Sequence, residues 1–182
     1  MIEKFIRLDA SLTEKLRVKS LKGFWSKIFA FFAHSGDSWF LLAGLAVVWF
    51  FTDGFWHGYT AYLAVCIIIL AVIVLVIKFS VKRTRPPGEW GEIYRNTDPH
   101  SFPSGHAARA VMLAMLAVTM GVQWFGVVMV IWAPLVVLAR VIMGVHYLSD
   151  VLAGTFLGLL AGYGFTVFYP WVAEIAPRLF SI

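Results

Sequence analysis

The segment between Tyr59 and Ile77 contains no charged residue and is long enough to cross the hydrocarbon core of a bilayer as one helix. The whole chain is 60% hydrophobic and 14% charged, whereas a soluble domain is roughly half apolar and roughly a quarter charged. Its eight Trp and sixteen Phe residues suit a protein with aromatic side chains at both membrane interfaces. The sequence therefore predicts an integral membrane protein and excludes an ordinary soluble enzyme.

Further apolar segments lie on both sides of this one, separated by short breaks. We expect helices over residues 38–51 (extending to 56), 59–77, 104–120, 122–144 and 147–169, with a tight turn near Gly121 and a break at residues 34–37. Residues 1–20 mix apolar and charged side chains like an amphipathic helix in the membrane interface, and residues 21–33 continue it, half-embedded or poorly spanning. The predicted fold is an all-α polytopic membrane bundle of about five to six transmembrane helices.

No linker interrupts this pattern, so we expect a single domain over residues 1–182. Residues 1–34 form its interfacial part and residues 37–170 its helical bundle. The last predicted helix carries Gly154, Gly158 and Gly162, whose four-residue spacing makes a smooth face for close helix packing.

This helix order brings three charged segments, around Lys78, around His106 and from Arg140 to Asp150, to one side of the membrane. The helix ending at Lys78 leads into a polar loop, the helix after Ser104 crosses away, and the next returns to Arg140 and His146. The ionisable residues on that side are Lys78, Lys82, Arg83, Arg85, Asp98, His100, His106, Arg109, Arg140, His146 and Asp150. Positively charged side chains heavily outnumber carboxylates on that side, which favours binding of an anionic ligand such as a phosphate. We interpret Lys82 and Arg83 as interfacial anchors, and for Lys78 and Arg140 both snorkelling and ligand binding remain open.

The stretch from His100 to His106 combines the features of an anion site at a helix N-terminus. Pro103 disfavours a helix before it, Ser104 is a good N-cap, and Gly105 allows a ligand to approach the backbone. His106 then places an imidazole in the first turn, beside free N–H groups and the positive end of the helix dipole. A plain helix cap with an incidental interfacial histidine is the alternative.

His146 and Asp150 are four residues apart at the start of the last predicted helix. If they share a helix face, Asp150 can accept the Nδ1–H of His146 and leave Nε2 as a nucleophile or base, while His106 acts as the acid. A helix-capping aspartate beside an interfacial histidine is the simpler alternative. A metal site built from His106, His146, Asp150 and either His100 or Asp98 is less favoured, because the nearby cations would repel a divalent ion.

Three signatures in this region resemble those of the type-2 phosphatidic acid phosphatases, membrane lipid phosphatases related to vanadium haloperoxidases. They are Lys78-x6-Arg85-Pro86, Pro103-Ser104-Gly105-His106 and Arg140-x5-His146-x3-Asp150, in the expected order and with the expected internal spacing. The family's third signature usually begins with Ser, where this chain has Ala139. That difference removes a hydroxyl contact and no catalytic group.

The resemblance implies a two-step hydrolysis that needs no metal or other cofactor. His146 attacks phosphorus to form a phosphohistidine, Asp150 orients it, and His106 protonates the leaving group and then activates water. The phosphoryl oxygens are held by Lys78, Arg85 and Arg140 and by the N–H groups of Ser104 and Gly105. Expected substrates are undecaprenyl diphosphate, phosphatidylglycerophosphate, phosphatidate or lipid A phosphate. Residues that can contact the lipid head group are Trp90, Tyr94, Arg95 and His100.

Two alternatives use the same residues, namely a lipid phosphotransferase and a non-catalytic protein that binds anionic lipids. The expected partners are the substrate lipid and the bilayer but no nucleic acid, and the sequence does not indicate an oligomeric state. The expected location is the cytoplasmic (inner) membrane. The positive-inside rule places the charged side in the cytoplasm. The family resemblance favours the outer face, which we prefer because the site cations serve phosphate and not topology.

Overall fold

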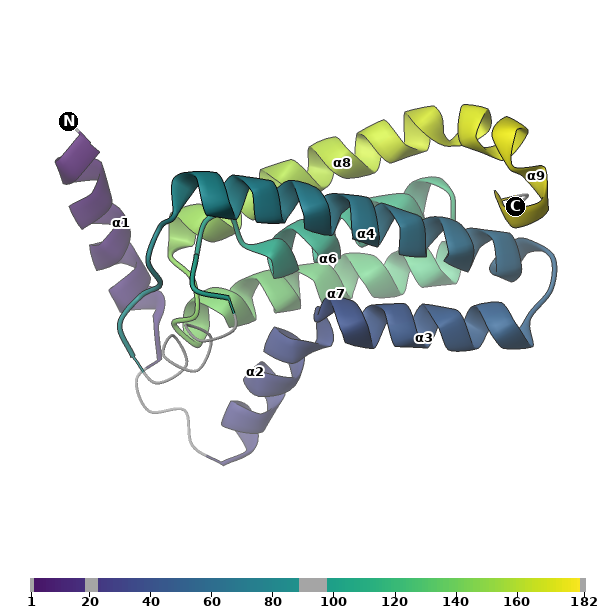
Figure 1. Cartoon of the computed structure of the whole chain (residues 1–182). Coiled ribbons are helices and arrows are strands. Elements are labelled where there is room, and N and C mark those ends of the chain that lie inside the picture. Colours follow the sequence, from purple (N-terminus) through teal and green to yellow (C-terminus); the bar gives the residue numbers. More distant parts are fainter. Residues whose placement is uncertain (1, 19–22, 89–97, 181–182) are drawn as a thin grey trace.

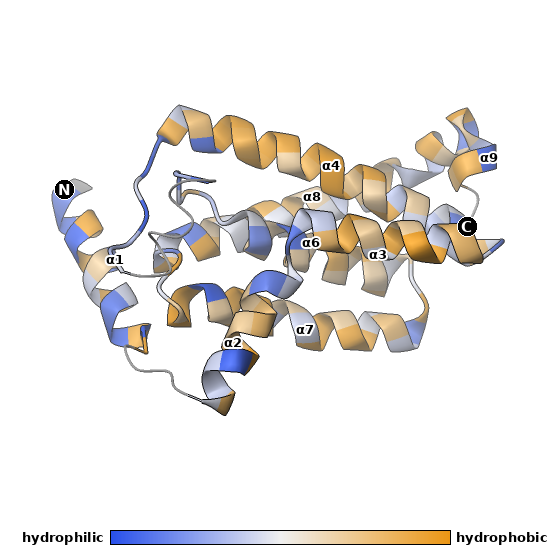
Figure 2. Ribbon diagram, turned by 60° about the horizontal axis from the view of Figure 1, so that its bottom comes forward, coloured by the Kyte–Doolittle hydropathy of each residue, from blue (hydrophilic) through white to orange (hydrophobic). Residues whose placement is uncertain are grey.

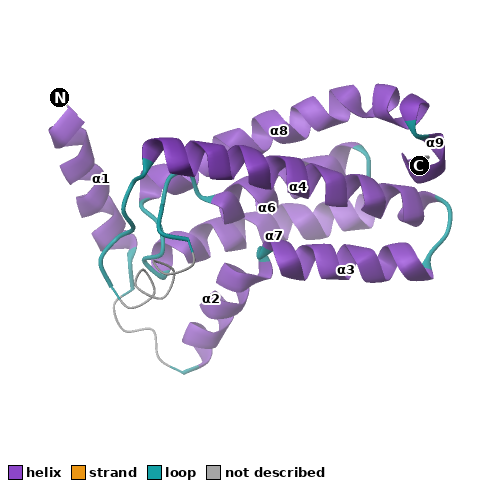
Figure 3. Cartoon of the chain, in the orientation of Figure 1, coloured by secondary structure: helices purple, strands orange, loops and turns teal. Residues whose placement is uncertain are grey.

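The computed structural model describes residues 2–18, 23–88 and 98–180, and these are almost entirely helical (Figure 3). The described helices are α1 (Ile2–Leu16), α2 (Phe24–Ser35), α3 (Ser38–Phe51), α4 (Phe55–Val81), α6 (Gly105–Thr119), α7 (Gln123–Ile142), α8 (Leu148–Ile175) and α9 (Pro177–Phe180). Within the described ranges the β-type pairing is limited to an isolated bridge between Thr84 and His100. The predicted all-α fold is confirmed.

Helix α6 packs against both α7 and α8 and is the most deeply buried part of the bundle (Figure 1). Close packing against α8 is possible because α8 presents Gly154 and Gly158 to it. A Cβ atom at either glycine would overlap a main-chain oxygen of α6 or its cap, that of Ser104 or Ala108. The predicted smooth glycine face is confirmed, and it fixes the start of α6 against the start of α8.

Three helices, α4, α7 and α8, are long and apolar enough to cross a membrane. Helices α2 and α3 would make a fourth crossing if taken together, although they are bent by 70° at the break between them. Helix α6 is apolar but has only 15 residues, short of the roughly 20 that a full crossing needs. Apolar residues dominate the long helices in Figure 2. The five predicted bundle helices are therefore present as α3, α4, α6, α7 and α8, and the two short ones fall below the length of a full span.

The three charged segments lie together at one end of this bundle, as the sequence indicated. The end of α4, the start of α6, the end of α7 and the start of α8 lie together there, while α9 lies at the opposite end (Figure 1). Helices α1 and α2 are at the charged end too. The predicted turn near Gly121 connects α6 to α7 at the other end.

Helix α1 lies across the charged end with two polar side chains directed into the protein. Asp9 and Thr13 are buried, whereas Phe5, Leu8 and Leu12 on the neighbouring stripe are exposed. This pattern matches the predicted amphipathic helix, with the refinement that part of its polar side faces protein. The predicted break at residues 34–37 is also found, since α2 ends at Ser35 and α3 begins at Ser38.

Candidate active site

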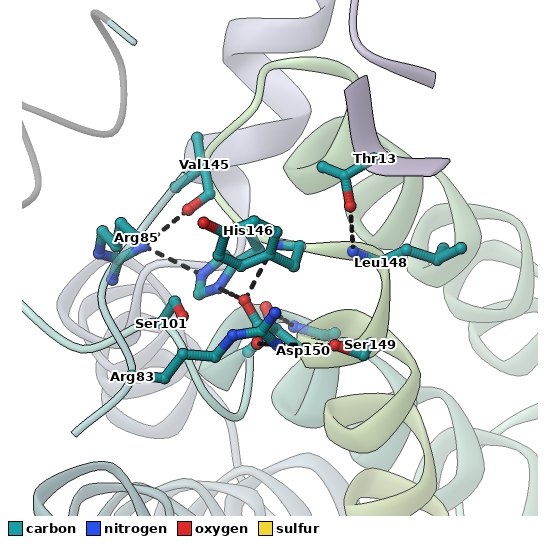
Figure 4. Close-up of polar contacts among 12 residues, drawn as sticks. Thr13, Arg83, Arg85, Ser101, Val145, His146, Leu148, Ser149 and Asp150 are labelled. Atoms are coloured by element: carbon teal, nitrogen blue, oxygen red, sulfur yellow. Dashed lines mark hydrogen bonds and ion pairs between the residues drawn. The ribbon is translucent and has the colours of Figure 1, made fainter. Parts of the chain in front are cut away.

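Asp150 lies in the first turn of α8 and His146 just before that helix, and both side chains are buried (Figure 4). Nδ1 of His146 is 3.7 Å from Oδ2 of Asp150, which allows electrostatic attraction but is longer than a hydrogen bond. Asp150 Oδ2 also accepts the N–H of Tyr147 at 2.9 Å and so caps α8. The capping role is therefore present, and the same carboxylate lies beside the His146 ring, so that a role in orienting the ring stays a prediction.

The two residues do not share a helical face, because α8 begins at Leu148, after His146. The position of His146 is set by a turn in which the N–H groups of Val145 and His146 both donate to the carbonyl of Arg140, at 3.1 and 3.2 Å. We expected helix periodicity to bring His146 next to Asp150. Instead, the turn that follows the end of α7 places His146 there.

Arg85 contacts the opposite side of the His146 ring. Its Nη1 lies 3.3 Å from Nε2 of His146 and donates to the carbonyl of Val145 at 3.1 Å (Figure 4). A guanidinium can only donate, so Nε2 carries the lone pair and the ring proton is on Nδ1, facing Asp150. Burial, followed by the charges of Arg140, Arg85 and Lys78, holds the pKa of His146 well below its ordinary value. His146 is therefore a neutral imidazole with an available lone pair at neutral pH.

Lys78, Arg85 and Arg140 form a cation cluster around His146, and all three side chains are buried. Arg140 donates from Nη1 to the carbonyl of Ala33 in α2 at 2.9 Å. Neither Lys78 nor Arg140 snorkels towards solvent, since their exposed fractions are 4% and 0%. Snorkelling, one of the two interpretations left open by the sequence, is therefore wrong for both residues, while ligand binding stays a prediction.

The carboxylate of Asp98 lies between two members of this cluster. Its Oδ2 accepts from Lys78 Nζ and lies 2.8 Å from Arg85 Nη2, while its main-chain oxygen accepts from Arg85 Nε at 2.7 Å. Burial acts to raise the pKa of Asp98, but the charges of Lys78 and Arg85 outweigh it, so the pKa is lowered. The cation cluster thus already contacts an ionised carboxylate.

The start of α6 follows the sequence prediction, with Ser104 as N-cap and Gly105 as the first helical residue. Ser104 Oγ accepts from the N–H of Ala107 at 3.5 Å. The N–H of Ser104, however, donates to the main-chain carbonyl of Asp150 at 2.9 Å. In contrast to our expectation of a phosphate contact, this N–H ties α6 to α8, and Gly105 is the part of the cap that faces a cavity.

His106 contacts a carboxylate that the sequence analysis did not select. Its Nε2 lies 2.6 Å from Oδ1 of Asp37, which follows the bend between α2 and α3. A Cβ atom at Gly36 would come within 3.1 Å of the His106 ring, and Arg109 donates from Nε and Nη2 to the Gly36 carbonyl at 3.1 and 3.0 Å. The sequence signal that could have identified Asp37 is its position as an acidic residue at a break between two apolar segments, because carboxylates within a membrane usually serve a function.

Arg83 is half-buried and connects two helices, so our interpretation of it as an interfacial anchor is wrong. Its guanidinium contacts Asp150 in α8 at 2.7 Å (Figure 4) and Asp9 in α1 at 2.6 Å. Asp9 and Asp37 add two carboxylates to the charged end, so the excess of cations is smaller than the sequence suggested. Lys82, by contrast, is exposed, as expected for an anchor.

Two cavities reach this site. One of about 400 Å³ is lined by Lys78, Asp98, Gly105 and His106, together with apolar side chains of α3 and α4, among them Trp39, Val74 and Leu75. A second, of about 550 Å³, is lined by Thr84, Arg85, Pro87, Pro99, His100 and Tyr147. His100 therefore lines the second cavity beside Arg85, where a head group can reach it.

Three predicted head-group residues, Trp90, Tyr94 and Arg95, lie outside the described residues. In the part of the chain that the structure describes, no three His, Cys, Asp or Glu side chains gather as a metal site requires. The metal-ligand set weighed from the sequence is thus not assembled among those residues.

Comparisons with known proteins agree with this geometry. Residues 59–174 match the PAP2 superfamily. The decaprenylphosphoryl-5-phosphoribose phosphatase of Mycobacterium tuberculosis is 38% identical over 93 residues, which cover 50% of this chain and 50% of that protein. Sphingosine-1-phosphate phosphatase 1 of Rattus norvegicus is 36% identical over 95 residues, covering 48% of this chain and 21% of that protein. The matched part of the chain thus spans half the length of these curated relatives or less.

Solved structures share the fold at low sequence identity. A transmembrane PAP2-type phosphatidylglycerolphosphate phosphatase from Bacillus subtilis has a TM-score of 0.73 at 22% identity, over 93% of this chain and 88% of that one. LpxE of Aquifex aeolicus has a TM-score of 0.66, also at 22% identity, over 87% of this chain and 94% of its own. The predicted family resemblance is confirmed: this integral membrane protein belongs to the PAP2 superfamily.

Proposed function

We propose that the protein is a metal-independent lipid phosphatase that works through a phosphohistidine on His146. The observation that carries this proposal is the environment of His146, with its Nε2 lone pair beside Arg85 and its Nδ1 side towards Asp150. Phosphoryl transfer depends mainly on positioning and on positive charge around the equatorial oxygens. Lys78, Arg85 and Arg140 supply that charge within a site from which bulk water is largely excluded.

In the first step, Nε2 of His146 attacks phosphorus and the bond to the lipid oxygen breaks. His106 gives a proton to that oxygen, and the negative charge of Asp150 stabilises the developing positive charge on His146. The distance of 3.7 Å between His146 and Asp150 shortens as the imidazole becomes cationic. In the second step, His106 takes a proton from water, which attacks the phosphohistidine and releases inorganic phosphate.

The cavity of about 400 Å³ suits a lipid whose head enters the site and whose chain lies against α3 and α4. Four lipids fit this description: undecaprenyl diphosphate, phosphatidylglycerophosphate, phosphatidate and lipid A phosphate. The related proteins are named as phosphatases of sphingosine-1-phosphate, lipid A, decaprenylphosphoryl-5-phosphoribose and phosphatidylglycerolphosphate, which supports a lipid phosphate as the substrate class. The second cavity, beside Arg85 and His100, offers a path for water and released phosphate.

The test is phosphate release from this lipid panel by purified protein in detergent, with a chelator present. We expect activity to persist with chelator and to be lost in His146→Ala, and an acid-labile phosphoprotein to be trapped from labelled substrate by rapid quenching. Full activity in His146→Ala would contradict the mechanism. Binding without turnover by the wild type would favour a lipid-binding protein, and transfer of label to an added lipid acceptor would favour a phosphotransferase.

We also propose that the site opens on the outer face of the cytoplasmic membrane. Ser80 and Asp53 are exposed and lie near opposite ends of α4, and the native Cys66 is buried. In intact cells, a membrane-impermeant maleimide should label Ser80→Cys and spare Asp53→Cys. The reverse pattern would place the site in the cytoplasm.

A further inference from the structure

We propose that Asp9 of α1 is a positioning residue for the nucleophile, acting through Arg83 on Asp150. The inference rests on the proposed function, because it assigns Asp9 a role in activating His146. Nothing in the local sequence around Asp9 indicates this role. It follows from the way α1 docks on the start of α8.

Side chains of α1 cap the first turn of α8 from outside that helix. Asp9 Oδ1 accepts the N–H of Ser149 at 3.0 Å, and Asp9 Oδ2 accepts the Ser149 hydroxyl at 2.5 Å. Thr13 Oγ1 accepts the N–H of Leu148 at 2.9 Å (Figure 4). The first N–H groups of a helix lack partners within it and are usually capped by a residue that immediately precedes it. Here the caps come from a helix about 140 positions earlier in the chain.

Arg83 connects this cap to the proposed active site. Its Nη2 contacts Asp9 Oδ2 at 2.6 Å, and its Nη1 contacts Asp150 Oδ1 and Ser149 Oγ, each at 2.7 Å. The guanidinium also stacks on the ring of Tyr147, 4.0 Å from its centroid. One arginine is therefore shared between two carboxylates and held in place on a third side by an aromatic face.

This sharing sets the net charge that His146 experiences. Burial tends to raise the pKa of Asp9, but its bonds to Ser149 and Arg83 outweigh burial and lower the pKa, so Asp9 is ionised at neutral pH. Asp9 then neutralises Arg83, and Asp150 keeps its negative charge for His146. Without the charge of Asp9, Arg83 would pair with Asp150 alone. Asp150 would be drawn towards Arg83, and the imidazolium formed during attack would lose its counter-charge.

The expected signature is a change in the titration of His146 together with a loss of rate. The charged groups that act on this ring are Arg85 and Lys78 from α4 and the loop after it, Arg140 from α7, His106 from α6, Asp98, and Asp150 from α8. Replacing Asp9 removes none of them. A lower pKa of His146 after that replacement would therefore report the uncompensated charge of Arg83.

The experiment compares three variants of the full chain. Asp9→Asn keeps an oxygen for the Ser149 N–H but cannot neutralise Arg83. Thr13→Val removes the neighbouring cap without changing charge, and Glu3→Gln makes the same charge change at an exposed site on α1. We expect Asp9→Asn to lower kcat about tenfold with an unchanged KM and to move the acidic limb of the kcat profile to lower pH. Thr13→Val and Glu3→Gln should leave that limb in place.

A purely structural role for Asp9 predicts a different result, namely a lower Tm in both Asp9→Asn and Thr13→Val with no movement of the acidic limb. That outcome, or wild-type kcat in Asp9→Asn, would overturn the inference. NMR titration of 13C-labelled histidines, with His146 assigned by its variant, provides a readout that does not need turnover. If the wild type hydrolyses no lipid phosphate, the proposed function fails on its own. A lowered His146 pKa in Asp9→Asn would still establish the coupling.

Discussion

Asp37 and His106 form a contact of 2.6 Å between a carboxylate oxygen and Nε2, which joins the bend after α2 to the first turn of α6. Asp37 also lies 3.4 Å from Nδ1 of His34, whose side chain is 45% exposed. The proposed acid is thus attached, through one carboxylate, to a histidine at the surface. A carboxylate in this position can hold the imidazole of His106 in the orientation that the proposed leaving-group acid requires.

Replacing this carboxylate should weaken acid catalysis selectively. In Asp37→Asn we expect kcat for a lipid phosphate to fall about tenfold or more, because an alkoxide leaving group needs the proton. Hydrolysis of p-nitrophenyl phosphate, whose leaving group needs little protonation, should fall much less. Asp53→Asn, an equivalent change at an exposed site at the opposite end of the bundle, is the control. Equal losses on both substrates would show that Asp37 acts on folding or binding instead.

The carboxylate of Asp98 occupies Lys78 and Arg85, so under the proposed function it competes with substrate for these two cations. In Asp98→Asn, orthovanadate should inhibit more strongly than in the wild type, with a competitive inhibition constant several-fold lower, because two cations lose an internal counter-charge. The measurement is inhibition of lipid phosphate hydrolysis at fixed ionic strength, with the exposed Glu174→Gln as control. Weaker inhibition in Asp98→Asn would mean that Asp98 serves to arrange the cations and not to compete.

The environment of His146 predicts how phosphatase activity depends on pH. Attack requires the neutral imidazole, and burial with the charges of Arg140, Arg85 and Lys78 holds the pKa of His146 well below 6.5. The neutral form therefore persists as pH falls from 7 through 6.5, and the acidic limb of the kcat/KM profile, which reports the free enzyme, should lie below 6.5. A limb above that value, moved by substitutions around His146, would contradict the described geometry.

Helix α8 should tolerate a larger side chain at one of its glycines, Gly164, but not at Gly154 of the glycine face. A Cβ at Gly154 would overlap the main-chain oxygen of Ser104, while one at Gly164 would meet no atom within 4 Å. Gly154→Ala should therefore destabilise the protein by about 1–3 kcal/mol and reduce activity, because the start of α6 must shift. Gly164→Ala should leave both unchanged. Thermal unfolding in detergent and the phosphatase assay test this pair, and similar Tm values for the two variants would refute it.

The sequence predicted most of the cation cluster because the spacing of its residues depends on simple membrane geometry. Apolar helices joined by short turns must alternate direction, so Lys78, His106 and Arg140 return to one side. Local rules also placed Ser104 as the cap of α6, because capping depends on a few neighbouring residues.

The contributions of Asp9, Asp37 and Arg83 could not be predicted in the same way. Each depends on the docking of α1 or on the 70° bend between α2 and α3, and these tertiary features leave no periodic pattern in the sequence. Arg83 also sits in a basic stretch where interfacial anchoring is the common explanation. The arrangement of His146 before α8 was missed for a different reason: it depends on a local turn closed on the carbonyl of Arg140, and such a turn has no periodic pattern in the sequence.

The contact between Asp98 and the cation cluster has a consequence for substrate binding. In the proposed mechanism, a phosphate that enters this site replaces the carboxylate of Asp98, so the buried cations keep a counter-charge before and after substrate binds. After hydrolysis the same exchange runs in reverse, with Asp98 competing against inorganic phosphate for Lys78 and Arg85. Product release would then be assisted by a side chain of the protein itself.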